Sequence, residues 1–385
     1  MKRRDFFKLG GMLAAASTLH ANPISLLKSS PVQKPNSGVN FLGEGLDLTP
    51  ADFVEILMRM VEEGKIKPDY YSNGGIVEEL EEKFAKHLGK ECAVFFPTGT
   101  LANQIAIRKL ALGKKRAIVQ AESHIYNDCG DCVQTLSNIN LVPLGAEQAS
   151  FTLAEVEAVI KKTASGRVKA PIGVISIESP VRRKTGEVFG FEEIKRISDY
   201  ARANDIKMHM DGARLFAEAG HTGRKPSDYS PYFDTIYTSL YKCFSSGSGA
   251  MLAGTKEFCE DLYHTRRMFG GGLPNVWPFA AIAINYVDNY IEEYKAARIK
   301  AEVLFEYLNK NTDLTITHIP NGTNLYQVRA NEGDLTEIAI KLSKQNVLMR
   351  SPRAGSNETL LAINPSLNNM TSEKLKEVFA YALKH

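Results

Sequence analysis

Short apolar segments alternate with amphipathic segments over most of the chain. Several apolar segments between residues 92 and 253 carry few polar side chains, as expected of strands buried on both faces. The predicted strands are Cys92–Phe96, Ala117–Gln120, Leu141–Leu144, Ile172–Ile177, Lys207–Met210, Thr235–Ser239 and Ala250–Ala253. Helical periodicity fills three of the intervals between them, at Thr100–Leu112, Leu153–Thr163 and Phe191–Ala203. This alternation predicts a doubly wound α/β domain with a mostly parallel sheet.

Helical patterns flank this alternating region on both sides. A helix is predicted to begin at Pro50 with Thr49 as its cap, and a second amphipathic helix is predicted over Ile76–Leu88. After the strands, residues 276–310 are predicted to form one long helix. This helix leads to a smaller α+β domain that ends in another helix at Ser372–Leu383.

The composition is that of an ordinary globular protein. The 385 residues correspond to two or three domains, with 44% hydrophobic and 24% charged residues. We assign residues 41–285 to a large domain with an N-terminal arm, and residues 286–385 to a small C-terminal domain. The formal net charge of +3 equals the charge of residues 1–8, so the rest of the chain is neutral. A neutral body lacks the basic surface of a protein that binds nucleic acid or an anionic membrane.

The N-terminal residues resemble an export signal. Arg3 and Arg4 precede the apolar stretch Leu9–Leu19, which is too short and too weakly hydrophobic to span a bilayer. Residues 1–21 resemble a twin-arginine signal, read by the Tat export machinery, which implies a periplasmic location; a basic tail without a targeting role is the alternative. Residues 22–40 contain several Pro, Ser and Asn and are predicted to be a linker. No other apolar stretch reaches membrane-spanning length, so we expect no membrane segment in the mature protein.

A candidate phosphate site follows the predicted strand Cys92–Phe96. Thr98, Gly99 and Thr100 lie where this strand turns into the next helix. Gly99 lets a ligand approach the backbone, the threonines add hydroxyls, and free N–H groups at a helix start favour an anion. A capped helix after a tight turn explains the same residues without a ligand.

Other chemically capable residues also lie at strand ends. Asp211 directly follows an apolar strand, where it could bind the N–H⁺ of a heterocycle or cap a helix. Lys242 follows the strand Thr235–Ser239 among small residues, where burial could leave it as an imine-forming amine; a surface lysine is the alternative. His124 follows another strand and is ambiguous by itself.

Together these groups match the parts of pyridoxal 5'-phosphate (PLP), namely its phosphate, ring nitrogen, flat ring and aldehyde. Five motifs in a fixed order extend the match. They are FPTGTLANQ at 96–104, HIY at 124–126, HMDGARLF at 209–216, SLYK at 239–242, and Arg266-Arg267 followed by Gly270-Gly271-Gly272. Over residues 40–385 the chain resembles the threonine aldolase and aromatic amino acid β-eliminating lyase family. This resemblance implies a PLP-dependent, fold type I, aspartate aminotransferase-like large domain with a mostly parallel sheet, plus a smaller C-terminal domain.

The resemblance also implies roles for individual residues. Lys242 would bind the cofactor aldehyde covalently, Asp211 would pair with the pyridinium nitrogen, and His124 would stack on the ring. The residues implied in cofactor binding are Thr98, Gly99, Thr100, His124, Asp211, Arg214, Ser239 and Lys242. The implied catalytic residues are Lys242, His124 and Asp211, with His124 as the candidate base for a β-hydroxyl proton. We expect a homodimer or homotetramer that acts on a small amino acid substrate.

The chain departs from the family where the substrate carboxylate is bound. The segment Phe41–Gly45 lacks the serine that the aldolases carry there, and the strand Thr359–Asn364 lacks their arginine. Arg214 and Arg353 are our candidates for binding the carboxylate, with Arg350 as an alternative to Arg353. The resemblance implies cleavage of a β-hydroxy or β-substituted amino acid to glycine and an aldehyde. The alternatives are β-elimination, transamination and a non-catalytic protein that keeps the fold.

Cys129 and Cys132 form a C-x-x-C pair close behind His124. Such a pair can be a redox couple, half of a zinc site or a disulfide. The sequence contains no second pair at zinc spacing, so we predict no metal. In an exported protein we expect a local disulfide, with two reduced cysteines as the alternative.

Overall fold

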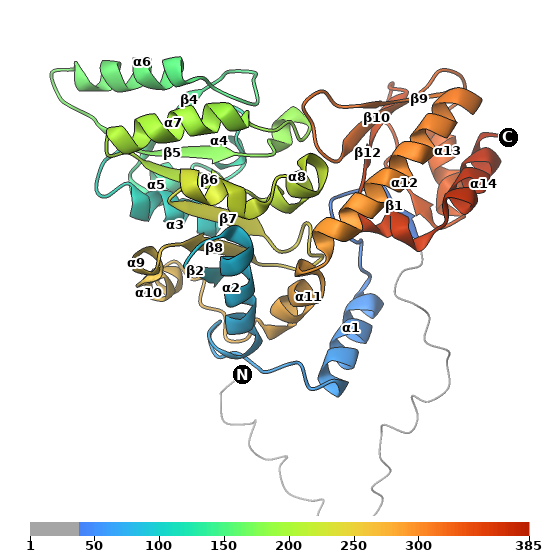
Figure 1. The fold of residues 1–385 in the computed structure, drawn as a ribbon, viewed down its shortest axis with the longest axis horizontal. Helices are drawn as coiled ribbons and strands as arrows, with labels where there is room; N and C mark the ends of the chain where they lie inside the picture. The colour runs from blue at the N-terminus through green and yellow to red at the C-terminus, as the bar shows by residue number, and fades with distance from the viewer. Residues whose placement is uncertain (1–37, 385) are drawn as a thin grey trace, which may run out of the picture. The chain divides into compact units, whose positions relative to one another are not determined.

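The computed structural model describes residues 38–384 (Figure 1). The predicted signal, residues 1–21, and most of the predicted linker, residues 22–40, lie outside the described residues. The end of the predicted linker is wrong, because Val39–Asn40 form strand β1, which pairs in parallel with β11 (Val347–Leu348). This pairing joins the start of the described chain to its C-terminal part.

A seven-stranded sheet forms the centre of the larger domain. Its strands are β2 (Cys92–Phe96), β3 (Arg116–Gln120), β4 (Asn140–Leu144), β5 (Ile172–Glu178), β6 (Lys207–Asp211), β7 (Thr235–Ser239) and β8 (Ala250–Gly254). They lie in the order β2-β8-β7-β6-β5-β3-β4; the pairs made by β8 are antiparallel and the others are parallel. The mostly parallel sheet is confirmed, and each predicted strand is present to within one residue at either end.

Each face of this sheet has its own apolar core. In β3, Ala117 and Val119 pack into one cluster with residues of helix α3 (Gly99–Leu110), whereas Ile118 packs into the other. This alternation is the period of two that a strand imposes on its side chains, so helices cover both faces. The other long helices of this layer are α2 (Gly75–Leu88), α6 (Leu153–Ala164), α7 (Phe191–Ala203) and α8 (Leu215–Thr222). The doubly wound prediction is confirmed.

Local sequence signals set the ends of several helices. Thr49 caps α1 (Pro50–Glu62): its hydroxyl accepts from the Asp52 N–H at 3.2 Å, and the Asp52 carboxylate accepts from the Thr49 N–H at 2.7 Å. Helix α2 ends at Gly89, whose φ of 64° is left-handed. The short helices of this domain are α4 (His124–Asn127), α5 (Cys132–Ser137), α9 (Lys256–Cys259) and α10 (Leu262–Met268), with 3-10 turns at Arg182–Lys184 and Pro226–Tyr232. Within residues 38–384, no helix is both long and apolar enough to cross a bilayer.

The prediction of a single helix over residues 276–310 is wrong. Two helices, α11 (Trp277–Val287) and α12 (Tyr290–Asn311), replace it. At the break between them, the Asp288 carboxylate accepts hydrogen bonds from Lys83 at 2.7 Å and His87 at 3.0 Å, both on α2. The break therefore coincides with contacts to a helix about 200 residues earlier, which no local pattern encodes. The boundary that we placed between residues 285 and 286 falls inside α11.

The smaller domain follows α12 and lies on the right of Figure 1. It contains an antiparallel sheet in the order β12-β10-β9 with two helices and a 3-10 turn, as the predicted α+β pattern requires. Its elements are β9 (Leu314–His318), β10 (Leu325–Ala330), α13 (Leu335–Ser343), β11, β12 (Glu358–Ala362), the turn Pro365–Asn369 and α14 (Ser372–Leu383).

A cluster of aromatic rings connects α12 to the larger domain. Phe244 contacts Phe84 on α2, Phe216 on α8 and Tyr290 on α12, with ring centroids 5.1, 4.8 and 5.7 Å apart. All four side chains are buried, and the rings meet edge to face. Such pairs add to the stabilisation from burial alone.

We expect Phe84→Ala to lower the free energy of unfolding by about 3–5 kcal/mol, because it leaves a cavity within this cluster. Val54→Ala is the control, since Val54 is 61% exposed and its truncation should cost less than about 0.5 kcal/mol. Urea unfolding of both variants measures the difference. Equal stability of the two variants would contradict the role of the cluster.

Candidate active site

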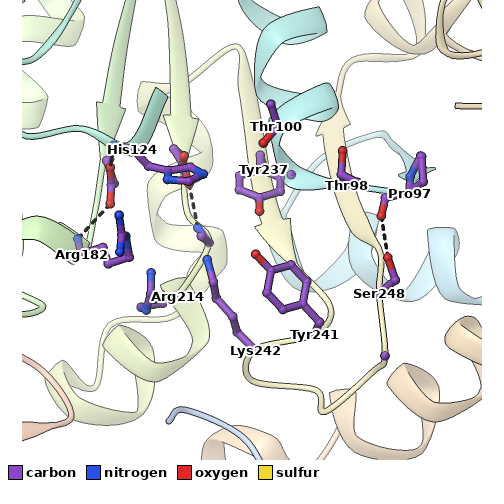
Figure 2. Close-up of a pocket in the computed structure, with 15 residues that line it drawn as sticks. Pro97, Thr98, Thr100, His124, Arg182, Arg214, Tyr237, Tyr241, Lys242 and Ser248 are labelled. Carbon is purple, nitrogen blue, oxygen red and sulfur yellow. Dashed lines mark hydrogen bonds between the residues drawn. The ribbon is translucent and has the colours of Figure 1, made fainter. Parts of the chain in front are cut away.

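Seven of the residues predicted from sequence line one cavity of about 620 Å³ (Figure 2). They are Thr98, Gly99, Thr100, His124, Asp211, Arg214 and Lys242. The cavity lies at the carboxyl ends of the parallel strands, where open α/β sheets bind their ligands. Ser239 and Arg353, which were also predicted, do not line this cavity.

The loop from Pro97 to Thr100 forms a compact cradle at the start of α3. The Thr98 hydroxyl accepts from the Leu101 N–H at 3.3 Å, so Thr98 is the helix cap that the alternative interpretation required. Ser248 donates a hydrogen bond to the Pro97 carbonyl at 2.8 Å. A Cβ on Gly99 would lie 2.0 Å from the Tyr237 hydroxyl, so only glycine fits here. The loop residues that cap helix α3 thus also form the cradle.

Ser239, at the end of β7, does not line the cavity. Its hydroxyl is buried, and a hydrogen bond with the Tyr237 side chain opposes the effect of burial, which raises the pKa of Tyr237. Ser239 is therefore a neighbour of the cavity-lining Tyr237 rather than part of the cavity wall.

Asp211 is fixed by a buried chain of hydrogen bonds. Asn103 Nδ2, on α3, donates to Asp211 Oδ2 at 2.7 Å, and the Ala213 N–H donates to Oδ1 at 3.2 Å. The Asn103 amide oxygen is 2.9 Å from His209 Nε2, and His209 Nδ1 is 2.8 Å from the Thr235 hydroxyl. Burial lowers the pKa of His209 to about 3, so this imidazole is neutral. Asp211 is therefore held as a fixed carboxylate rather than as a helix cap.

Lys242 extends into the cavity between Arg214 and Tyr241 (Figure 2). Burial, followed by the positive charge of Arg214, lowers the pKa of Lys242 to about 8, against the opposing effect of nearby carboxylates. Its ammonium nitrogen lies 5.4 Å from the centre of the Tyr241 ring. At pH 7 about a tenth of this lysine is consequently a neutral amine, far more than for a lysine of ordinary pKa.

His124 begins α4 on the other side of the cavity. Its backbone N–H donates to Glu178 Oε2 at 2.6 Å, and its Nδ1 lies 3.4 Å from the Asp128 carboxylate. Contact with the Cys129 side chain raises the pKa of His124, while burial opposes the shift. Glu178 therefore anchors the backbone of His124, while the Asp128 carboxylate lies near its imidazole without a hydrogen bond to Nδ1.

The sequence interpretation missed Glu178, Arg182, Tyr237 and Tyr241, which line the same cavity. Glu178 is 3% exposed and pairs in register with Asp211 on the adjacent strand. Burial, followed by the charge of Asp211, raises the pKa of Glu178. A signal for Glu178 was present, because it ends an apolar strand just as Asp211 does.

Arg214 forms a partly buried ion pair with Glu44 of the N-terminal arm, in which the two side chains are 13% and 17% exposed. Although burial opposes it, the Arg214 charge lowers the pKa of Glu44, and this partner raises the pKa of Arg214. Glu44 bonds only the Nε of the guanidinium, so the two terminal nitrogens keep their donors. Glu44 belongs to Phe41–Gly45, the segment that lacks the serine expected from the aldolases. In this chain the segment therefore contributes a carboxylate, which pairs with Arg214.

Arg353 lines a neighbouring cavity of about 380 Å³ together with Arg350. That cavity shares Arg182 and Arg214 with the first one. The structure thus brings Arg353 to the vicinity of the site without placing it beside Lys242.

Cys129 and Cys132 are both free thiols in the structure, in contrast to the expected disulfide. Cys129 Sγ lies 3.7 Å from the Thr100 hydroxyl, and Cys132 is buried at the start of α5. Cys129 thus contacts both the cradle and His124.

Comparison with known proteins agrees with this geometry. The profile of the beta-eliminating lyases matches residues 55–330. A low-specificity L-threonine aldolase of Candida albicans is 26% identical over 76% of this chain and 80% of its own, and one of Saccharomyces cerevisiae is 27% identical over 86% and 84%. A Listeria monocytogenes structure, provisionally described as an L-allo-threonine aldolase, has a TM-score of 0.72 and 27% identity over 90% of this chain and 95% of its own.

These matches confirm the family resemblance, the fold type I architecture and the PLP dependence that the five motifs implied. The matched profile covers more than two thirds of the chain, including every residue described for the candidate site except Glu44, Arg350 and Arg353. This chain belongs to the beta-eliminating lyase family and is a PLP-dependent lyase.

Proposed function

We propose that this enzyme cleaves the Cα–Cβ bond of a β-hydroxy amino acid and releases glycine and an aldehyde. The observation that carries the proposal is the convergence of Lys242, Asp211, His124 and the Gly99 cradle on one cavity. The threonine aldolases among its relatives support the same reaction class.

The residues of the cavity fit PLP. The N–H groups at the start of α3, with Thr98 and Thr100, would hold its phosphate, which can approach closely because position 99 has no Cβ. Asp211 would hold the ring nitrogen in its protonated form by a charge-assisted hydrogen bond, and Lys242 would hold the aldehyde carbon. When bound, PLP withdraws electrons from the bonds at the Cα of an amino acid.

The side chains of this cavity can bind the substrate carboxylate and transfer the protons of the reaction. The terminal nitrogens of Arg214 are free to bind the substrate α-carboxylate, because Glu44 occupies only Nε. His124 would take the proton of the β-hydroxyl as the Cα–Cβ bond breaks, which turns Cβ into the aldehyde carbon. Lys242 would then return a proton to Cα, which completes glycine, and its low pKa suits proton exchange near neutral pH.

We also propose that the enzyme is a homodimer or a homotetramer. Val54, Met58 and Val61 lie on one face of α1 at helical spacing, and each is more than half exposed. A row of exposed apolar side chains supports an interface between copies of this chain.

We expect the purified enzyme to release glycine and an aldehyde in equal amounts from threonine or another β-hydroxy amino acid. Lys242→Ala should lower kcat at least a hundredfold, and His124→Asn should lower it by about a hundredfold or more, the usual contribution of a positioned base. Lys256→Ala, an exposed lysine on α9, is the matched control and should change nothing. Glycine, aldehyde, keto acid and ammonia are measured together. Keto acid without aldehyde would replace the proposal with transamination, and keto acid plus ammonia with β-elimination.

The lowered pKa of Lys242 gives a prediction about cofactor capture. Only the neutral amine attacks an aldehyde, so the rate at which the cofactor-free protein captures PLP should rise with pH and level off above about 8. Arg214→Gln removes a positive charge that lowers this pKa, so its midpoint should lie at higher pH. Absorbance after rapid mixing measures the rate. A rate that still rises near pH 10 in the unsubstituted protein would contradict the assignment of Lys242.

We further propose that the folded enzyme is exported to the periplasm by the Tat machinery. The paired Arg3 and Arg4 support this route, and a cofactor held in a buried cavity favours folding before transport. Replacing both arginines by lysine should retain the protein in the cytoplasm, as fractionation and immunoblotting would show. An unchanged distribution between fractions would contradict the signal.

A further inference from the structure

The second cavity, of about 380 Å³, lies beside the active site, between the larger domain and the smaller one. Arg182 and Arg214 form part of the wall of both cavities, so the two spaces adjoin. Arg350 and Arg353, from the loop after β11, contribute to the wall on the side of the smaller domain.

The charges around this second cavity are not balanced. Arg214 is paired with Glu44, and Arg182 is paired with Asp128. Arg350 donates a hydrogen bond to the backbone carbonyl of Leu42 and forms no ion pair within the described residues.

The Arg353 carbonyl accepts a backbone hydrogen bond from the Ser356 N–H at 2.9 Å, but its guanidinium forms neither a hydrogen bond nor an ion pair with any residue from 38 to 384. Glu358 lines a further cavity shared by both Arg350 and Arg353, but its carboxylate accepts from Gln327 at 2.6 Å and pairs with neither arginine. Two guanidinium groups beside the active site therefore lack a carboxylate partner in the described chain.

Guanidinium groups are well suited to bind carboxylates, since they offer two parallel N–H donors. One carboxylate of the substrate, on Cα, is within the reach of Arg214 in the first cavity. A substrate with only that carboxylate would leave Arg350 and Arg353 unused. A second carboxylate at the end of the substrate side chain would extend from the first cavity into the second and meet them.

We propose that the second cavity binds an acidic group on the substrate side chain, so that the enzyme prefers β-hydroxy amino acids with a distal carboxylate. This inference rests on the function proposed above. It moves Arg353 from the α-carboxylate, where the sequence placed it, to the far end of the substrate. The same bond then breaks as in any β-hydroxy amino acid: the hydroxyl proton leaves, Cα gains a proton to give glycine, and the aldehyde product carries the second carboxylate.

The test compares acids with their amides, which have the same shape without the charge. The substrates are 3-hydroxyaspartate and 3-hydroxyglutamate, each against 3-hydroxyasparagine or 3-hydroxyglutamine, and glycine release gives kcat and KM. We expect the better acid to exceed its amide at least tenfold in kcat/KM. Comparison of the 3-hydroxyglutamate pair with the shorter 3-hydroxyaspartate pair shows which side-chain length brings the distal carboxylate into the second cavity.

Arg353→Gln and Arg350→Gln should each reduce the preference for the acid by about tenfold to a hundredfold, mainly through KM. The kcat/KM for the amide should stay within about twofold. Arg329→Gln is the matched control, because Arg329 is an exposed arginine on the neighbouring strand β10 that lines neither cavity. Equal losses for acid and amide would overturn the proposal, since they would mean that these arginines bind the α-carboxylate. The absence of any acid preference would also overturn it.

A binding measurement separates this inference from the proposed function. Calorimetry of the PLP-loaded enzyme compares succinate with butyrate, which differ by one carboxylate. If no substrate yields glycine, the proposed function fails. Succinate that binds more tightly than butyrate, with this difference lost in Arg353→Gln, would still support an acid-binding cavity. Equal binding of both compounds overturns the cavity assignment.

Discussion

Asp211 is held by a buried chain of hydrogen bonds that runs from Thr235 on β7 through His209 on β6 to Asn103 on α3. Because Asn103 lies one turn into α3, the same chain fixes the helix whose first turn contains Gly99. The acid for the ring nitrogen and the cradle for the phosphate are thus set relative to each other. A neutral His209 lets this network exist in the core without adding a buried charge.

The charges of the site are arranged around this fixed carboxylate. Burial and Arg214 disfavour the ammonium form of Lys242, while Glu44 neutralises much of the Arg214 charge. Burial raises the pKa of Glu178, and the charge of Asp211, its partner in register on the adjacent strand, raises it further. The charge of each group therefore shifts the pKa of its neighbours. Removal of one member of the Arg214–Glu44 ion pair would leave an uncompensated charge.

Different parts of the chain build the two sides of the site. The cofactor side comes from strand ends and loops between residues 97 and 248, which share one continuous sheet. The substrate side adds Glu44 from the N-terminal arm and Arg350 and Arg353 from the smaller domain. The parallel pair β1–β11 joins these two segments, so the N-terminal arm and the loop after β11 both reach the wall of the second cavity.

The sequence alone determined the central strands, because buried parallel strands require apolar runs that are visible locally. It also singled out Asp211 and Lys242 as candidates, since they lie at or shortly after the ends of such strands. Only the tertiary structure decided the helix break at Asp288, the place of Arg353 and the partnership of Glu44 with Arg214. Glu44 and Arg214 are 170 residues apart, and Asp288 contacts a helix about 200 residues earlier. Such pairings depend on how distant segments pack, and local periodicity and composition carry no record of that packing.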